Sequence, residues 1–62
     1  MDTKTPEYRE GLSDGFVAKL DGKPARYVHN AAKGRYEHTT GRFSFNQDYA
    51  AGYVAGYTKG MQ

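Results

Sequence analysis

The chain contains no cysteine, which excludes disulfide bonds, thiolate metal sites and catalysis by a cysteine nucleophile. Because this absence is compatible with a reducing compartment, we expect a cytoplasmic protein. No apolar run reaches the roughly 18–20 residues that span a bilayer, and no signal-peptide core follows Met1. We therefore expect no membrane among its partners.

Isoleucine and tryptophan are absent too, and six tyrosines supply much of the apolar bulk. A core built from tyrosine must keep each hydroxyl near water or a partner, so we expect it to be thin. A chain of 62 residues is near the lower limit for one hydrophobic core. Such chains are stable by only about 3–5 kcal/mol unless they associate. We predict one small domain over residues 1–62 that relies on a larger partner or, alternatively, on a second copy in a homodimer.

What the chain does have is a repeated frame, first in residues 8–16 and again in residues 49–57. In each, a tyrosine is followed by glycine three and seven residues later, with a large apolar residue after each glycine. Glycine in a helix interior costs about 0.8–1 kcal/mol relative to alanine, and a spacing of four places the glycines on one helix face. A close helix contact would offset that cost. We therefore assign structural helix packing to Gly11, Gly15, Gly52 and Gly56.

The first repeat lies in a segment with clear helix start and stop signals. Thr5 suits the N-cap and Pro6 the first helical position. Gly22 suits the position after the last turn, and Pro24 prevents continuation. The apolar residues of the segment recur every four positions: Tyr8, Leu12, Phe16 and Leu20. The pattern predicts a helix over about residues 6–21.

The second repeat predicts a helix over about residues 47–60. Asn46 is a suitable N-cap, and Asp48 suits the positive end of the helix dipole. Its stripe consists of Tyr49, Tyr53, Tyr57 and Met61. The two stripes allow two interpretations: they are buried against each other inside the fold, or they form a contact surface for a partner.

Between the helices, residues 25–45 alternate in the manner of short strands. Residues 25–29 suit a strand, and Asn30 to Gly34 reads as a turn. If Thr40 and Gly41 form a second turn, residues 35–39 pair with residues 42–45. Across that ladder the opposed pairs would be Tyr36 with Phe45 and His38 with Phe43.

These segments predict an α+β fold. Its N- and C-terminal helices pack antiparallel through their glycine faces, with a small antiparallel β-hairpin or meander between them. The alternative is an all-α helical hairpin with an irregular linker.

The middle of the chain is basic, although the net charge of the whole is only +2. Residues 23–42 set five cations against Glu37: Lys23, Arg26, Lys33, Arg35 and Arg42. An aromatic ring follows an arginine three times, at Tyr27, Tyr36 and Phe43. Arginine neutralises phosphate and rings stack on bases, so this interleaving suits RNA. In a strand the same neighbours point to opposite faces, which is ordinary amphipathic patterning.

Residues that could carry chemistry are few. The only candidate metal or acid–base set consists of His29 and His38 with Glu37. The two histidines are nine residues apart, and no third ligand lies at a spacing typical of zinc sites. The glycines of the helices have no strand–loop–helix context and no following Lys-Ser/Thr, so they form no phosphate loop. We predict a non-enzyme without cofactor or metal.

The layout Gly11-x-x-x-Gly15, then Gly22-Lys23-Pro24, then a basic aromatic connector, then Gly52-Tyr53-x-x-Gly56-Tyr57 resembles ribosome modulation factor and related short proteins. The resemblance implies a pair of glycine-containing helices joined by a linker. It also implies binding to the small ribosomal subunit and silencing of translation.

We predict a small non-enzymatic regulator or inhibitor that binds the surface of a larger protein or ribonucleoprotein, of the kind that phages and mobile elements encode. The alternatives are an RNA- or ribosome-binding protein that modulates translation and a structural homodimer subunit. The candidate partner-binding residues are Arg26, Tyr27, Lys33, Arg35, Tyr36, Arg42, Tyr53 and Tyr57.

Overall fold

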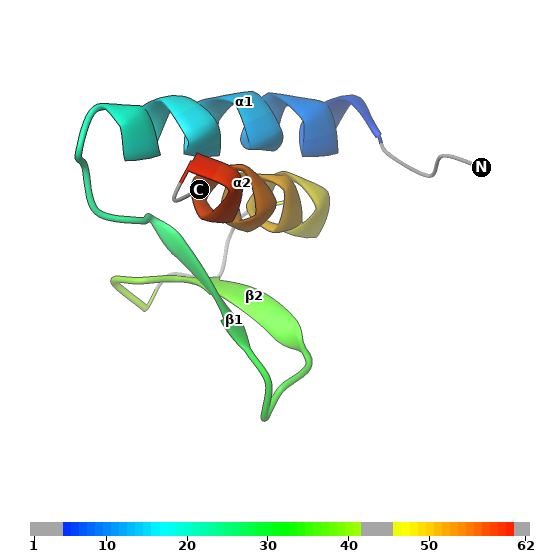
Figure 1. The fold of residues 1–62 in the computed structure, drawn as a ribbon. Helices are drawn as coiled ribbons and strands as arrows, with labels where there is room; N and C mark the ends of the chain where they lie inside the picture. The colour runs from blue at the N-terminus through cyan, green and yellow to red at the C-terminus, as the bar shows by residue number, and fades with distance from the viewer. Residues whose placement is uncertain (1–4, 42–45, 61–62) are drawn as a thin grey trace.

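A computed structural model of the chain describes residues 5–41 and 46–60. In chain order these form helix α1 (Pro6–Leu20), strands β1 (Tyr27–Asn30) and β2 (Arg35–His38), and helix α2 (Gln47–Gly60). The helices pack on each other, and the two strands form an antiparallel hairpin against α2, on the side away from α1 (Figure 1). The α+β layout is confirmed, and the all-helical alternative is wrong.

The ends of α1 follow from its capping residues. Thr5 has extended backbone angles, and its hydroxyl accepts a hydrogen bond from the Tyr8 amide at 3.2 Å. At the other end, the Lys23 amide donates to the Ala18 carbonyl at 2.9 Å, while Gly22 has a φ of 74°. This is a Schellman motif, which needs a left-handed residue after the cap. The helix ends one residue before the predicted bound.

Helix α2 begins and ends where the sequence predicts. The Asn46 side-chain oxygen accepts a hydrogen bond from the Tyr49 amide at 3.0 Å, so Asn46 caps the first turn. Asp48 lies in that turn, where a carboxylate stabilises the positive end of the helix dipole.

The hairpin turns at Asn30 to Gly34, as predicted. The Gly34 amide donates to the Asn30 carbonyl at 2.8 Å, and its φ of 67° favours glycine. The cross-strand pairs are Tyr27 with His38, Val28 with Glu37, His29 with Tyr36, and Asn30 with Arg35. Tyr36 and His38 therefore face β1. Their predicted pairs with Phe45 and Phe43 involve residues outside the described part of the chain.

The helices run in the same direction, so the prediction of antiparallel packing is wrong. At their N-terminal ends the Thr5 hydroxyl donates to an Asp48 carboxylate oxygen at 3.2 Å. At their C-terminal ends Gly60 lies beside the Lys19 side chain. The reason is the connector: α1 has 15 residues, about 22 Å of helix, and the segment between the helices is long enough to lead the chain back along it. A short loop would have forced the antiparallel arrangement.

Parallel packing turns the sequence repeat into an internal two-fold relation. Gly11 of the first repeat lies against the backbone of Tyr49 and Tyr53, and Gly52, at the same place in the second repeat, lies against the backbone of Tyr8 and Leu12. Tyr8 and Tyr49 are the first residues of the two repeats, and Leu12 and Tyr53 each follow the first glycine of a repeat. The contact is thus isologous, like that of a two-fold dimer, but it lies within one chain.

The helices approach too closely for any side chain at the four contact glycines. A β-carbon added at Gly11 would collide with the Tyr49 carbonyl oxygen and lie 2.8 Å from the Tyr53 amide nitrogen. At Gly52 it would collide with the Tyr8 carbonyl oxygen. A glycine hydrogen occupies that direction instead and faces the carbonyl oxygen, which is the arrangement of a weak Cα–H···O contact.

The core beside this contact is thin and built around one ring. Among the described residues, Ala50 and Tyr53 are the buried apolar side chains, with exposures of 0% and 1%. The Tyr27 ring of β1 meets the rings of Tyr49 and Tyr53 edge-on, with centroids 5.8 and 5.3 Å away. The hairpin therefore closes the core over α2.

Candidate binding surface

Arg26, which precedes β1, ties the connector to both helices. Its guanidinium donates to the Tyr49 hydroxyl at 3.0 Å, and that hydroxyl donates to an Asp14 carboxylate oxygen at 2.5 Å. The guanidinium carbon also lies 5.0 Å from the centre of the Tyr53 ring, within the range of a cation–π interaction. Connector, α2 and α1 are thereby joined through three side chains.

The pKa values of this group follow from its contacts. Burial, followed by the hydrogen bond to Asp14, raises the pKa of Tyr49 to about 12. A hydrogen bond with the Tyr53 hydroxyl is the main cause that raises the pKa of Arg26, against the opposing effect of burial. At neutral pH the group therefore contains a neutral phenol and a cationic guanidinium.

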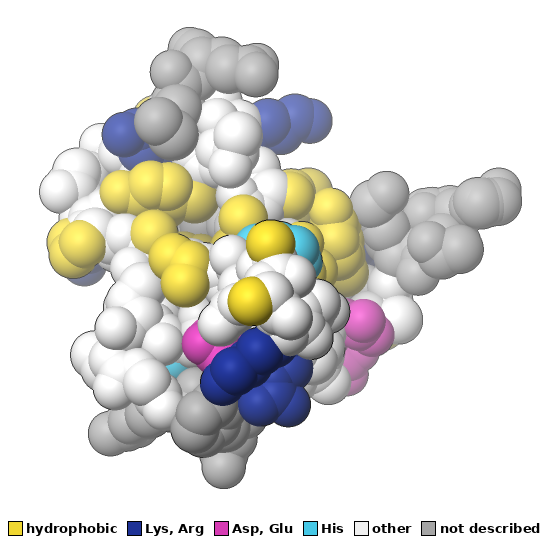
Figure 2. Space-filling model, turned by 90° about the horizontal axis from the view of Figure 1, so that it is seen from below, with side chains coloured by type: hydrophobic (Ala, Val, Ile, Leu, Met, Phe, Trp, Pro, Cys, Tyr) yellow, Lys and Arg dark blue, Asp and Glu magenta, His cyan; other side chains and the backbone are white. Residues whose placement is uncertain are grey.

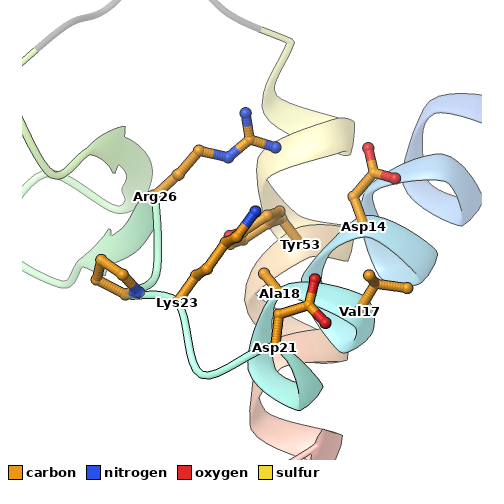
Figure 3. A pocket seen from close by; sticks show the side chains of 8 residues that line it. Asp14, Val17, Ala18, Asp21, Lys23, Arg26 and Tyr53 are labelled. Carbon is orange, nitrogen blue, oxygen red and sulfur yellow. The ribbon is translucent and has the colours of Figure 1, made fainter.

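A cavity of about 400 Å³ lies between α1 and the connector. The residue that caps the end of α1, Asp21, lines one wall together with Asp14, and the connector places Lys23 and Arg26 on the other (Figure 3). Tyr53 lies between the walls, at the back of the cavity. We call this cavity the connector pocket.

Next to the connector pocket, the C-terminal half of α1 exposes large apolar side chains. Phe16 is 41% exposed, Val17 50% and Leu20 65%. We call these three residues the α1 outer patch. Val17 also lines the connector pocket, so the patch and the pocket form one continuous surface.

The rings that the sequence assigned to a partner surface are largely used inside the fold. Tyr53 is in the core and only 1% exposed, because the hairpin covers it, so little of its ring is open to a partner. The Tyr57 hydroxyl donates to the Lys23 carbonyl at 2.7 Å, and the Lys19 ammonium lies 5.3 Å from its ring centre. Tyr27 packs on α2. The stripe of α2 therefore binds the connector and the hairpin of its own chain.

Among the described cations, Arg26 precedes the hairpin and bonds to α2, whereas Lys33 and Arg35 lie in the hairpin turn and in β2. Arg26 is exposed and donates to the Tyr49 hydroxyl, whereas Lys33 at the hairpin turn pairs with Glu37 at 3.2 Å. A hydrogen bond from the Asn30 side chain and then this lysine hold the pKa of Glu37 below its usual value. Arg35 is exposed on β2, and Arg42 lies outside the described residues. Figure 2, seen from the hairpin side, shows Lys and Arg side chains at the front.

Tyr36 holds the hairpin to α2 through its backbone rather than through its ring. The Gln47 side chain accepts from the Tyr36 amide at 2.9 Å and donates to the Tyr36 carbonyl at 3.0 Å. The Tyr36 ring lies against His29, with centroids 4.8 Å apart. The rings of His29 and Tyr36 therefore contact each other within the hairpin, whereas the Tyr27 ring contacts α2.

Over residues 5–41 and 46–60, no three His, Asp or Glu side chains are grouped so that they could hold a metal ion. Neither helix in this part is long and apolar enough to cross a membrane.

Neither family models, nor curated proteins, nor solved structures give a match to this chain. The resemblance to ribosome modulation factor stays a prediction.

Sequence reasoning missed the connector pocket and the α1 outer patch. A signal for the first was present: Asp14 and Asp21 lie seven residues apart, on one face of a helix, and Lys23 and Arg26 follow at once. The α1 outer patch could not be recognised, because the exposure of the apolar side chains of α1 depends on which helix the hairpin covers.

Proposed function

We propose that this protein is a small non-enzymatic regulator or inhibitor that acts by covering a surface of a larger protein. The observation that carries the proposal is the α1 outer patch: Phe16, Val17 and Leu20 are neighbours on one helix and are left exposed in a chain with very little core. Burying one large apolar side chain is worth about 1.5–3 kcal/mol. Three such side chains on a rigid helix are a reason for a partner to bind there.

The charges around the patch favour a protein over RNA. Glu10, Asp14 and Asp21 follow one another at spacings of four and seven along α1 and its cap. Asp14 and Asp21 line the connector pocket beside Val17, and carboxylates repel phosphate. Two of the cations predicted to contact RNA have intramolecular partners: Arg26 donates to a tyrosine hydroxyl, and Lys33 pairs with a glutamate. The α1 outer patch therefore supports a protein partner.

The test is capture from a lysate of the source cells with immobilised protein, with and without nuclease, analysed by quantitative mass spectrometry. We expect a protein that the wild type retains in both samples and that Leu20→Asp releases. Val28→Asp is the matched control, because Val28 is also exposed (45%) but lies on the hairpin. Circular dichroism must show that both variants are folded.

Two results would contradict the proposal. One is recovery of nothing above background in either sample. The other is retention that nuclease abolishes and that Leu20→Asp leaves unchanged, which would favour the RNA- or ribosome-binding alternative.

A further inference from the structure

The connector pocket separates two kinds of charge. Asp14 and Asp21 come from α1 and its cap, and Lys23 and Arg26 come from the connector, which leaves the helix and then turns back toward α2 (Figure 3). No ion pair joins the two walls among the described residues. The carboxylates and cations that line the cavity are therefore not paired directly, and Arg26 and Asp14 are linked only through the Tyr49 hydroxyl.

The walls also keep hydrogen-bonding capacity. A guanidinium has five N–H donors, and Arg26 donates to the hydroxyls of Tyr49, at 3.0 Å, and Tyr53, which leaves further donors for a ligand. A carboxylate accepts at about four positions, and Asp14 accepts from the same tyrosine at 2.5 Å. A ligand can therefore use both walls without breaking the contact that joins them through Tyr49.

The pocket is held in shape before any ligand arrives. The Tyr57 hydroxyl donates to the Lys23 carbonyl at 2.7 Å, and the Lys23 amide closes the Schellman motif on Ala18 at 2.9 Å. A preformed site loses less conformational entropy on binding than a site that must first be ordered. Its volume of about 400 Å³ lies within the range of small-ligand pockets.

From these features we propose that the connector pocket binds a basic amino acid, either free or as the C-terminal residue of a peptide. The cationic end of the ligand lies against Asp14 and Asp21, and its carboxylate lies against Lys23 and Arg26. Val17, Ala18 and Pro24, which also line the cavity, contact the aliphatic stem between the two ends. The inference does not depend on the proposed function, because a small molecule can test it without the larger partner.

The experiment is a titration of the full ¹⁵N-labelled chain, followed by amide chemical shifts, with three arginine probes at millimolar concentration. Free L-arginine and N-acetyl-Ala-Ala-Arg with a free carboxylate represent the two sources of the ligand. N-acetyl-Ala-Ala-Arg amide has the guanidinium but no carboxylate. We expect saturable shifts around residues 14–26 with at least one of the first two, and binding about tenfold weaker with the amide.

Substitutions on each wall sharpen the assignment. Asp21→Asn and Lys23→Gln should each weaken binding about tenfold. Their matched controls, Glu10→Gln and Arg9→Gln, remove the same kinds of charge from exposed positions of α1 that do not line the cavity, and should leave binding unchanged.

The results of the titration either identify the source of the ligand or overturn the proposal. Saturation by the free amino acid alone would assign the site to amino acids. Saturation by the peptide would assign it to C-terminal residues. No saturable shift with either probe, or equal binding of peptide acid and amide, would overturn the proposal.

Discussion

Helices α1 and α2 contain the same repeat, yet the hairpin covers the face of α2 and leaves that of α1 uncovered. On α2 the rings of Tyr49 and Tyr53 are covered by Tyr27 of the hairpin. On α1 the corresponding residues, Tyr8 and Leu12, are half-buried, and neither strand contacts this helix within the described residues. The glycine contact is thus shared by both helices, whereas the hairpin covers only one of them.

The difference lies in the side chains beside the glycines. Tyr49 and Tyr57 have hydroxyls that bond to Asp14 and to the Lys23 carbonyl, which fixes the connector across α2. The residue of α1 that corresponds to Tyr57 is Phe16, which has no hydroxyl and is 41% exposed. The glycines therefore determine how the two helices pack, and the residues that follow or precede them determine which helix the connector and the hairpin cover.

The largest expected effect is at the shared contact. Gly11→Leu and Gly52→Leu should each abolish folding, since the added β-carbon collides with backbone atoms that cannot move aside. Overpacking by about 1–3 kcal/mol or more is comparable with the whole stability expected of so small a chain. The gain in helix propensity is only about 1 kcal/mol. Thermal unfolding followed by circular dichroism measures the effect.

Gly60→Ala is the control for this prediction. A β-carbon there lies 2.7 Å from the Cβ and Cγ of Lys19 and 3.6 Å from the Phe16 carbonyl oxygen, so it does not collide with the backbone of α1, and the loss of stability should be smaller than at Gly11 or Gly52. A raised melting temperature for Gly11→Leu or Gly52→Leu would show that the glycine face is not buried.

A second comparison tests the unequal faces at positions that correspond in the two repeats. Tyr53→Ala should lower the free energy of unfolding by about 3–5 kcal/mol, since this ring is fully buried. Leu12→Ala should lower it by only about 1–2 kcal/mol, since Leu12 is half-buried. Urea denaturation of both variants gives the two values. Equal losses would mean that the hairpin does not distinguish the two helices.

The half-buried Tyr49 hydroxyl of α2 predicts that the stability of the folded protein falls at alkaline pH. The pKa of Tyr49 is raised in the folded protein to about 12, so its neutral form is favoured by folding. Its contribution to stability is complete below the unfolded pKa of about 10 and is lost as the pH rises through about 12. Ultraviolet titration of tyrosinate should show a late component in the wild type that Tyr49→Phe lacks. Ionisation of all six tyrosines together near pH 10 would contradict this assignment.

The smallest expected effect on folding is at the α1 outer patch. Leu20→Ser should change the free energy of unfolding by no more than about 0.5 kcal/mol, because its side chain is 65% exposed. Chemical denaturation of the variant beside the wild type measures it. A loss above about 2 kcal/mol, typical of a core position, would mean that this residue is buried in the folded protein.

Local features of the fold could be predicted from the sequence, because capping and turn chemistry act over a few residues. Thr5, Pro6 and Asn46 mark the helix starts, and Gly34 marks the turn of the hairpin. The direction of packing could not be predicted, because a glycine stripe at a spacing of four fits a parallel or an antiparallel neighbour. The connector pocket depends on a further arrangement, in which Arg26, Asp14 and Tyr49 come from three separate segments.

The measurement that tests the central claim most directly is the direction of the two helices. A nitroxide spin label attached at Glu7→Cys lies at the exposed start of α1, in a chain with no other cysteine. Since α2 has 14 residues, its ends are about 20 Å apart, and paramagnetic broadening should differ clearly between them. Parallel packing predicts the strongest broadening at residues 47–49 and the weakest at residues 58–60. The reverse gradient would contradict the two-fold glycine contact.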